Sequence, residues 1–414
     1  MNGVRRAIGI AVLASVAGCS GADDEGGVVI TTVSEYGGSP IAGVRVQVDD
    51  EEWATTDQRG EAGFVGIEPP YSVRLFQALE TESMRFQDVW ELVDQTETRL
   101  EIPVDGSRVT THEGDITGSI SGTTGGESQI AVFGGKFPDT GAVSLAEEDG
   151  TFQLAGFRWE GPASRSFDLH ALESDTADPP THYIGFGNAS ITLRDSGEGA
   201  TAEASIELAP VGESHVTGSV AVADGLAPAL RPSLRLELAD GAAVDLGSGD
   251  AALTPGDFEL TAPDIDGATM RLAFRGGDLT GGPPAGPSAY VSLALTLPAD
   301  DVAIDLPAAV ELVEPADGAS IDGATVFRWD ELAGGTRYGL HLSCEWDGGN
   351  VNYRLIETTG TEVSLPDIPE LDVGAGATCF WRVGWFEGEA TGYESVTLPA
   401  ELRSSWSAER SASF

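Results

Sequence analysis

Positive charge is scarce in this chain. Among 414 residues there are 22 lysines and arginines against 67 aspartates and glutamates, so the formal net charge is -45. Lys136 is the only lysine, and the arginines are scattered along the chain rather than clustered. Nucleic-acid binding normally needs a basic patch that releases condensed counterions, so we expect no nucleic-acid partner. The acidic excess is most simply a solvated, self-repelling surface, and adaptation to salt or divalent cations is the alternative.

Cysteine is also scarce, with only 3 residues, and the first of them follows a leader-like segment. Arg5 and Arg6 precede an apolar run over residues 7–17. A run of this length is too short to cross a bilayer as a helix. The next residues, Val16-Ala17-Gly18-Cys19, resemble the lipobox of bacterial lipoproteins.

The lipobox resemblance implies where the protein works. A lipoprotein leader, here residues 1–19, is cleaved so that the lipidated Cys19 becomes the first residue, and the buried acyl chains hold the protein on a membrane. Residues 20–26 would then form a flexible acidic tether. Ser20 resembles a signal for delivery to the outer membrane, so we expect an exported, lipid-anchored envelope protein. An ordinary secretory signal with a chance cysteine is the alternative.

Long apolar stretches and helical periodicity are missing beyond the leader. The recurring pattern is alternation of apolar and polar residues over about five to eight positions, which is typical of strands. Turn residues interrupt it, among them 54 glycines and 22 prolines. A content of 41% hydrophobic residues is enough to fill ordinary cores. Together with the alternation and the turn residues, it predicts an all-β fold of tandem antiparallel β-sandwich domains.

Three segments in the middle of the chain recur in the same order, as "ITGSISG" and "VTGSVAV" illustrate. This order predicts two related sandwiches over residues 107–211 and 212–310. The segment "LEIPVDG" resembles their closing strand, which places an earlier domain over 27–106 and leaves a fourth over 311–414. The recurring pairs begin at Ile116 and Val216, at Gly150 and Gly256, and at Ala204 and Val302.

The first and last domains each resemble a known family. The segments "GSPIAGVRVQV" from Gly38 and "TTDQRGEAGFVGI" from Thr55 resemble the carboxypeptidase regulatory-like domain, a transthyretin-like sandwich without peptidase chemistry. The segments "TRYGLHLSC" and "CFWRVGWFEGE" near the other end resemble a fibronectin type III-like domain. The first resemblance implies a β-sandwich of a kind that is common in bacterial surface proteins, and the second also implies a β-sandwich.

Two cysteines remain once Cys19 is assigned to lipid. An even pair in an exported protein favours a disulfide. In the fibronectin type III-like fold the two strands concerned are antiparallel neighbours, so the resemblance brings Cys344, at the end of one strand, beside Cys379, at the start of the other. We therefore predict a Cys344–Cys379 disulfide, which would stabilise the domain by about 3–4 kcal/mol.

Catalytic motifs are missing from the sequence. His112-Glu113 is not completed to HExxH by a second histidine, and no GxSxG, CxxC or P-loop motif occurs. Carboxylates are so abundant that pairs arise by chance, and small sandwiches seldom provide the deep cleft of a glycosidase. We expect no enzyme and no cofactor. A secreted hydrolase, the alternative, would need a pocket with convergent polar groups.

Calcium is the better metal candidate, because carboxylates and carbonyls are its preferred ligands. The densest acidic turns are "VDDEEW", with Asp49 and Asp50, and "PDIDGA", with Asp264 and Asp266. The second turn fails as an EF-hand, since alanines would occupy the first and twelfth ligand positions. Weak calcium binding is therefore an expectation, and acidic turns without a metal are the alternative.

Three tryptophans are candidates for stacking against sugar rings. Trp53, Trp159 and Trp346 lie beside acids and glycines and look loop-borne. Packing in a core or at its rim is the alternative for each of them. We interpret the chain as a non-enzymatic, membrane-anchored lipoprotein that serves as a structural spacer or as a scaffold for envelope proteins. A polysaccharide-binding surface protein is the alternative, and exposure of these tryptophans would favour it.

Overall fold

The computed structural model consists of β-strands and connecting turns, which confirms the all-β prediction. None of the residues that it describes forms a helix that is long and apolar enough to cross a membrane. The described residues are 27–34, 38–80, 85–104, 109–122, 127–135, 142–147, 149–196, 199–227, 230–247, 254–277, 286–332, 337–347, 349–358, 360–364, 373, 376–387 and 401–413.

The first three sandwiches share one strand arrangement. In each, the first strand pairs antiparallel with the fourth and parallel with the seventh, which makes a three-stranded sheet. The second sheet has the order third, second, fifth, sixth. The first sandwich consists of β1 (Gly27–Ser34), β2 (Arg45–Val48), β3 (Ala54–Thr55), β4 (Glu61–Val65), β5 (Tyr71–Glu80), β6 (Arg85–Gln95) and β7 (Arg99–Val104).

The second sandwich adds a short eighth strand to this arrangement, and the third repeats it. The second consists of β8 (Thr111–Ser121), β9 (Ser128–Gly134), β10 (Ala142–Leu145), β11 (Thr151–Glu160), β12 (Ser164–Asp175), β13 (Tyr183–Arg194), β14 (Ala200–Glu207) and β15 (Ala209–Pro210). The third consists of β16 (Gly212–Val222), β17 (Leu230–Glu237), β18 (Ala243–Asp245), β19 (Gly256–Asp264), β20 (Thr269–Gly277), β21 (Ser288–Leu295) and β22 (Ala299–Leu306).

The fourth sandwich is arranged differently. Its small sheet has the order β23-β25-β28, and its larger sheet contains β30-β29-β26-β27, with β31 paired to β29 and β24. These strands are β23 (Leu312–Glu314), β24 (Ala319–Ser320), β25 (Val326–Trp329), β26 (Arg337–Trp346), β27 (Gly349–Thr358), β28 (Glu362–Ser364), β29 (Thr378–Glu387), β30 (Glu401–Trp406) and β31 (Arg410–Ser413).

The recurring sequence segments lie on equivalent strands, and their shared glycine has a packing role. A Cβ at Gly118 of β8 would lie 2.2 Å from the Ala204 carbonyl oxygen, and one at Gly218 of β16 would lie 2.0 Å from the Val302 carbonyl oxygen. Each glycine also faces a phenylalanine ring, Phe152 or Phe258, at 2.5 and 2.7 Å from the same Cβ position. Glycine is therefore required where the parallel strand and the ring approach this closely.

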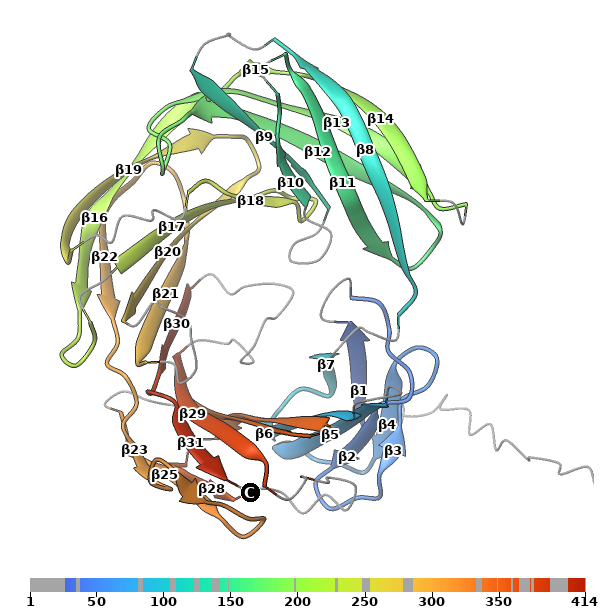
Figure 1. Ribbon diagram of the computed structural model, residues 1–414, viewed down its shortest axis with the longest axis vertical. Coiled ribbons are helices and arrows are strands. Elements are labelled where there is room, and N and C mark those ends of the chain that lie inside the picture. Colours follow the sequence, from blue (N-terminus) through green and yellow to red (C-terminus); the bar gives the residue numbers. More distant parts are fainter. Residues whose placement is uncertain are drawn as a thin grey trace, which may run out of the picture.

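The four sandwiches are arranged in a closed ring (Figure 1). Ser34 of the first sandwich donates a 2.7 Å hydrogen bond to Glu160 of the second. The core of the third sandwich includes Phe133 and Leu172 from the second. The third joins the fourth through antiparallel pairing of β21 with β30. Each sandwich thus contacts the next one along the chain.

The ring closes where the fourth sandwich meets the first. Strand β27 pairs in parallel with β6, from Gly349 opposite Arg85 to Ile356 opposite Leu92. This pairing makes β3, β2, β5 and β6 part of one 14-stranded sheet with strands of the third and fourth sandwiches. No feature of the sequence indicates this closure. We call the β6–β27 contact the seam.

Hydrophobic packing covers both faces of β5 and β6 at the seam. Trp90 and Leu92 belong to the core of the first sandwich. Phe76 and Val89 point to the opposite face and belong to the core of the fourth sandwich. Successive strand residues face opposite sides of a sheet, so a strand buried on both faces must lie between two packed layers. The core of the fourth sandwich therefore extends onto β5 and β6, and the separate core of the first sandwich covers the other face of the same two strands.

Candidate functional site

The predicted disulfide is present in the fourth sandwich. Cys344 of β26 lies directly opposite Cys379 of β29, with an S–S distance of 2.07 Å and a Cα–Cα distance of 4.0 Å. Both cysteines are fully buried. Cys19 lies outside the described residues, so its lipidation stays a prediction.

The prediction that Trp159 is loop-borne and contacts sugar is wrong. Trp159 lies within β11, is fully buried, and donates a 2.9 Å hydrogen bond from Nε1 to the Pro162 carbonyl. A bulge between Leu154 and Phe157, where Gly156 has a φ of 68°, shifts the alternation by one residue. The bulge turns Phe157 and Trp159 into the core, because one extra residue reverses which side chains face inward.

The other two candidate tryptophans lie at the edge of one hydrophobic cluster. Trp53, before β3, and Trp346, at the end of β26, are both half-buried against the core that contains the seam. The Arg45 guanidinium lies 4.6 Å from the centre of the Trp53 ring. This geometry is that of a cation–π contact, which occupies one face of the ring. Sugar binding by Trp53 and Trp346 stays a prediction.

The four candidate calcium ligands lie in two separate turns. Asp49 has a φ of 48°, and its carboxylate accepts a 2.7 Å hydrogen bond from the Ser72 amide, which holds the turn after β2. Asp50 follows it in that turn, whereas Asp264 ends β19 and Asp266 lies in the turn before β20. Among the described residues, no three His, Cys, Asp or Glu side chains are grouped to hold a metal. Calcium binding stays a prediction.

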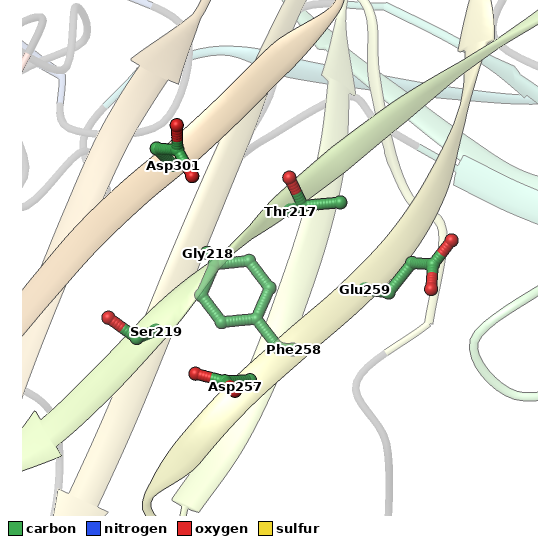
Figure 2. Close-up of a pocket in the computed structure, with 7 residues that line it drawn as sticks. All are labelled: Thr217, Gly218, Ser219, Asp257, Phe258, Glu259 and Asp301. Carbon is green, nitrogen blue, oxygen red and sulfur yellow. The ribbon is translucent and has the colours of Figure 1, made fainter.

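Two hollows lie on the third sandwich, and both carry acids. Figure 2 shows the larger one, of about 630 Å³, with Asp257 and Glu259 of β19, Asp301 of β22 and the Phe258 ring across Gly218. The second, of about 580 Å³, contains Asp264 and Asp266 at one end of the sandwich. Neither lining contains a histidine or a cysteine among the described residues. Sequence analysis missed the first hollow, although the recurring Thr-Gly-Ser segment lines it.

Polar contacts in the seam join two sandwiches. The Glu91 carboxylate of β6 accepts hydrogen bonds of 2.8 Å from Arg74 and 2.7 Å from the Tyr353 hydroxyl of β27. Asn352 donates a 3.2 Å hydrogen bond to Asp88 one position along. Burial, followed by the Glu91 charge, raises the pKa of Tyr353 well above its ordinary value. The seam, which joins the first and fourth sandwiches, is therefore our candidate functional site.

Comparison with known proteins identifies no family. No protein-family model matches the chain, and no curated protein is similar in sequence. Among solved structures, the fimbrial anchor protein Mfa2 from Porphyromonas gingivalis is 9% identical with a TM-score of 0.18, over 39% of this chain and 77% of that one. The Bacillus anthracis TIE protein is 12% identical with a TM-score of 0.16, over 67% of this chain and 49% of that one.

A third solved structure is a putative adhesin from Bacteroides ovatus, which is 8% identical with a TM-score of 0.16, over 48% of this chain and 93% of that one. The chain spans about half the length of the TIE protein. Likeness at this level carries no argument about function.

Proposed function

We propose that this chain is a non-enzymatic, exported envelope protein, anchored by lipid at Cys19, whose four sandwiches form a ring that acts as an interaction scaffold. The observation that carries the proposal is the parallel pairing of β6 with β27. A spacer needs length, and four sandwiches in a line would supply it. Closure brings the last sandwich back to the first, so the ring does not extend as far as a line of four sandwiches would. The ring instead presents the outer surfaces of the sandwiches to partners.

The short segment between Cys19 and β1 supports attachment of the ring close to a membrane. The proposed tether, residues 20–26, leads directly into β1, which begins at Gly27. A flexible chain of this length spans roughly 15 Å on average. The envelope proteins that we propose as partners would therefore meet the outer sheets of the ring near the membrane surface.

The strand orders support the two family resemblances, which remain proposals. The three-plus-four arrangement of the first sandwich agrees with a transthyretin-like, carboxypeptidase regulatory-like domain. The fourth sandwich, with β23-β25-β28 facing β30-β29-β26-β27, agrees with a fibronectin type III-like domain. The transthyretin-like module that the first sandwich resembles is common in bacterial surface proteins, which is consistent with a scaffold.

The anchor is tested by fractionating cells that express the full chain or its Cys19→Ala variant. We expect the unchanged chain in the membrane fraction, labelled by an alkyne fatty acid, and the variant without label. Ser20→Ala is the matched control and should keep the label, because it leaves the acylated sulfur in place. An unchanged chain without label, or a labelled Cys19→Ala variant, would contradict lipid anchoring at this cysteine.

The scaffold role is tested by photo-crosslinking in living cells from the outer sheets of the ring. A photoreactive residue at Glu259 of β19, which is exposed, should capture envelope proteins, whereas one at the buried Leu260 should not. Capture of identical proteins from both positions, or of none from several exposed positions, would argue against a scaffold.

A further inference from the structure

The inner sheet of the third sandwich carries two arginine pairs. Leu234 and Leu236 of β17 point into the core, so the alternating residues of this strand face the other side. The strand register then places Arg231 opposite Arg275 of β20, and Arg235 opposite Arg271. This sheet lies on the side of the sandwich that faces the middle of the ring (Figure 1). Strand pairing therefore brings together arginines that are scattered along the sequence.

One pair shares a carboxylate partner, and the other pair has none among the described residues. Glu237 lies 3.0 Å from Arg271 and 3.6 Å from Arg235. Arg231 and Arg275 are both exposed, and neither forms an ion pair or a side-chain hydrogen bond with any residue that the structure describes. Guanidinium groups stay charged at every accessible pH. Like charges directly opposite each other across a sheet are destabilising.

The chain has an ample supply of acids that could have relieved this repulsion. It holds 67 acidic residues against 22 basic ones, and ion pairs with carboxylates neutralise exposed arginines elsewhere, such as Arg158 with Glu113 at 3.2 Å. Two arginines that lie directly opposite each other without acidic partners are therefore unexpected on composition alone. An anion from outside the described chain would remove the repulsion and gain charge-assisted hydrogen bonds from both guanidinium groups.

An aromatic side chain extends the arginine pair along the same row of the sheet. Tyr290 of β21 lies directly opposite Arg275 and is half-buried. The row continues to Ser404 of β30, and in the adjacent row the Arg382 guanidinium lies 4.5 Å from the centre of the Trp406 ring. Arginines and aromatic rings on one face suit a ligand that combines an oxyanion with a ring.

We propose that Arg231 and Arg275 form an oxyanion site that binds the carboxylate, sulfate or phosphate group of an acidic saccharide. The two guanidinium groups clamp the oxyanion by parallel N–H donors, and Tyr290 contacts the sugar ring that carries it. Nucleic acid is disfavoured, since two exposed arginines neutralise too few phosphates for tight binding to a backbone. The site stands independently of the lipid anchor and of the seam.

The test is calorimetric titration of the chain with three probes: trigalacturonate, inorganic sulfate and inorganic phosphate. For each probe that binds the unchanged chain, Arg231→Gln and Arg275→Gln should each lower the affinity by about tenfold or more. Each substitution removes a bidentate charged contact. Arg158→Gln removes the same charge from an exposed arginine of the second sandwich and should leave binding unchanged. Thermal unfolding of each variant verifies the fold.

The probes and a fourth variant separate the sources of the oxyanion. If the ligand is an acidic saccharide, trigalacturonate binds more tightly than either inorganic ion, and Tyr290→Ala weakens trigalacturonate only. If sulfate or phosphate binds equally well and Tyr290→Ala has no effect, the oxyanion site stands but the saccharide assignment is overturned. Absence of saturable binding by all three probes, or equal weakening by Arg158→Gln, overturns the site.

Discussion

The Tyr353 hydroxyl of β27 donates a 2.7 Å hydrogen bond to the Glu91 carboxylate of β6, across 262 positions of sequence. The same carboxylate accepts a bond from Arg74, so one acid connects the first and fourth sandwiches. Tyr353 is fully buried and Glu91 is half-buried, and a hydrogen bond to a charged group is worth more in such a place than at an open surface. This contact holds the ring closed together with the eight paired positions of the two strands.

Loss of the Tyr353 hydroxyl should weaken the seam selectively. Tyr353→Phe keeps the apolar packing of the aromatic side chain but leaves one Glu91 oxygen without its hydrogen-bond donor. This loss should lower the free energy of unfolding by about 1–3 kcal/mol. Hydrogen exchange should accelerate at amides of β6 and β27. Tyr338→Phe is the control, since its hydroxyl accepts a 2.7 Å bond from the Leu332 amide within the fourth sandwich. Unchanged exchange at β6 in the Tyr353 variant would argue against a closed seam.

Buried tyrosines should make the ring sensitive to alkali. Burial is the main cause that raises the pKa of Tyr71 to about 12 and that raises the pKa values of Tyr183 and Tyr353. Unfolded tyrosines ionise near pH 10, so between about pH 10 and pH 12 the folded chain holds more protons than the unfolded chain. This stabilisation is complete below about pH 10 and is lost as pH rises further. Denaturant midpoints across that range, with tyrosinate absorbance, provide the check.

Tyr183 offers a sharper test of the same point. Its hydroxyl is buried without a hydrogen-bond partner among the described residues, although Asp175 and Glu213 lie near enough to raise its pKa. Tyr183→Phe removes an unsatisfied polar group, so we expect the chain to become more stable by about 1 kcal/mol at neutral pH. The alkaline loss should also become shallower. A destabilised variant would show that the hydroxyl has a partner.

The recurring glycines should resist substitution. Gly218→Ala places a Cβ 2.0 Å from the Val302 carbonyl oxygen, so β22 or β16 must shift and the free energy of unfolding should fall by about 3 kcal/mol. Gly323→Ala is the matched control, because no atom lies within 4 Å of its Cβ position and its φ is not positive. Equal denaturation midpoints for the two variants would refute the packing role of Gly218.

Local patterns in the sequence predict much of this fold. Alternation predicts the strands, and the pairing of Cys344 with Cys379 follows from their places on neighbouring strands of the resembled fold. The recurring Thr-Gly-Ser segments lie on β8 and β16, which have equivalent positions. These features depend on residues near in sequence or on one conserved strand order, so pattern and resemblance are sufficient to find them.

Other features depend on register, and sequence patterns could not supply it. Trp159 faces the core because a bulge at Gly156 reverses the alternation after Leu154. The opposition of Arg231 and Arg275 depends on how β17 aligns with β20. The seam joins two strands, either of which could have paired elsewhere, since any edge strand offers unpaired donors and acceptors.

The most direct measurement is disulfide formation between cysteines introduced on the two sides of the seam. Asp88 and Asn352 lie opposite each other in the parallel register, their side chains 3.2 Å apart. Neighbouring strands lie about 4.8 Å apart, which suits a disulfide. In the Asp88→Cys/Asn352→Cys chain, a closed ring predicts a peptide pair linked through positions 88 and 352, identified by mass spectrometry after mild oxidation. The Asp257→Cys/Asn352→Cys control should remain unlinked. Two free thiols at positions 88 and 352, with the native Cys344–Cys379 bond intact, would contradict closure of the ring.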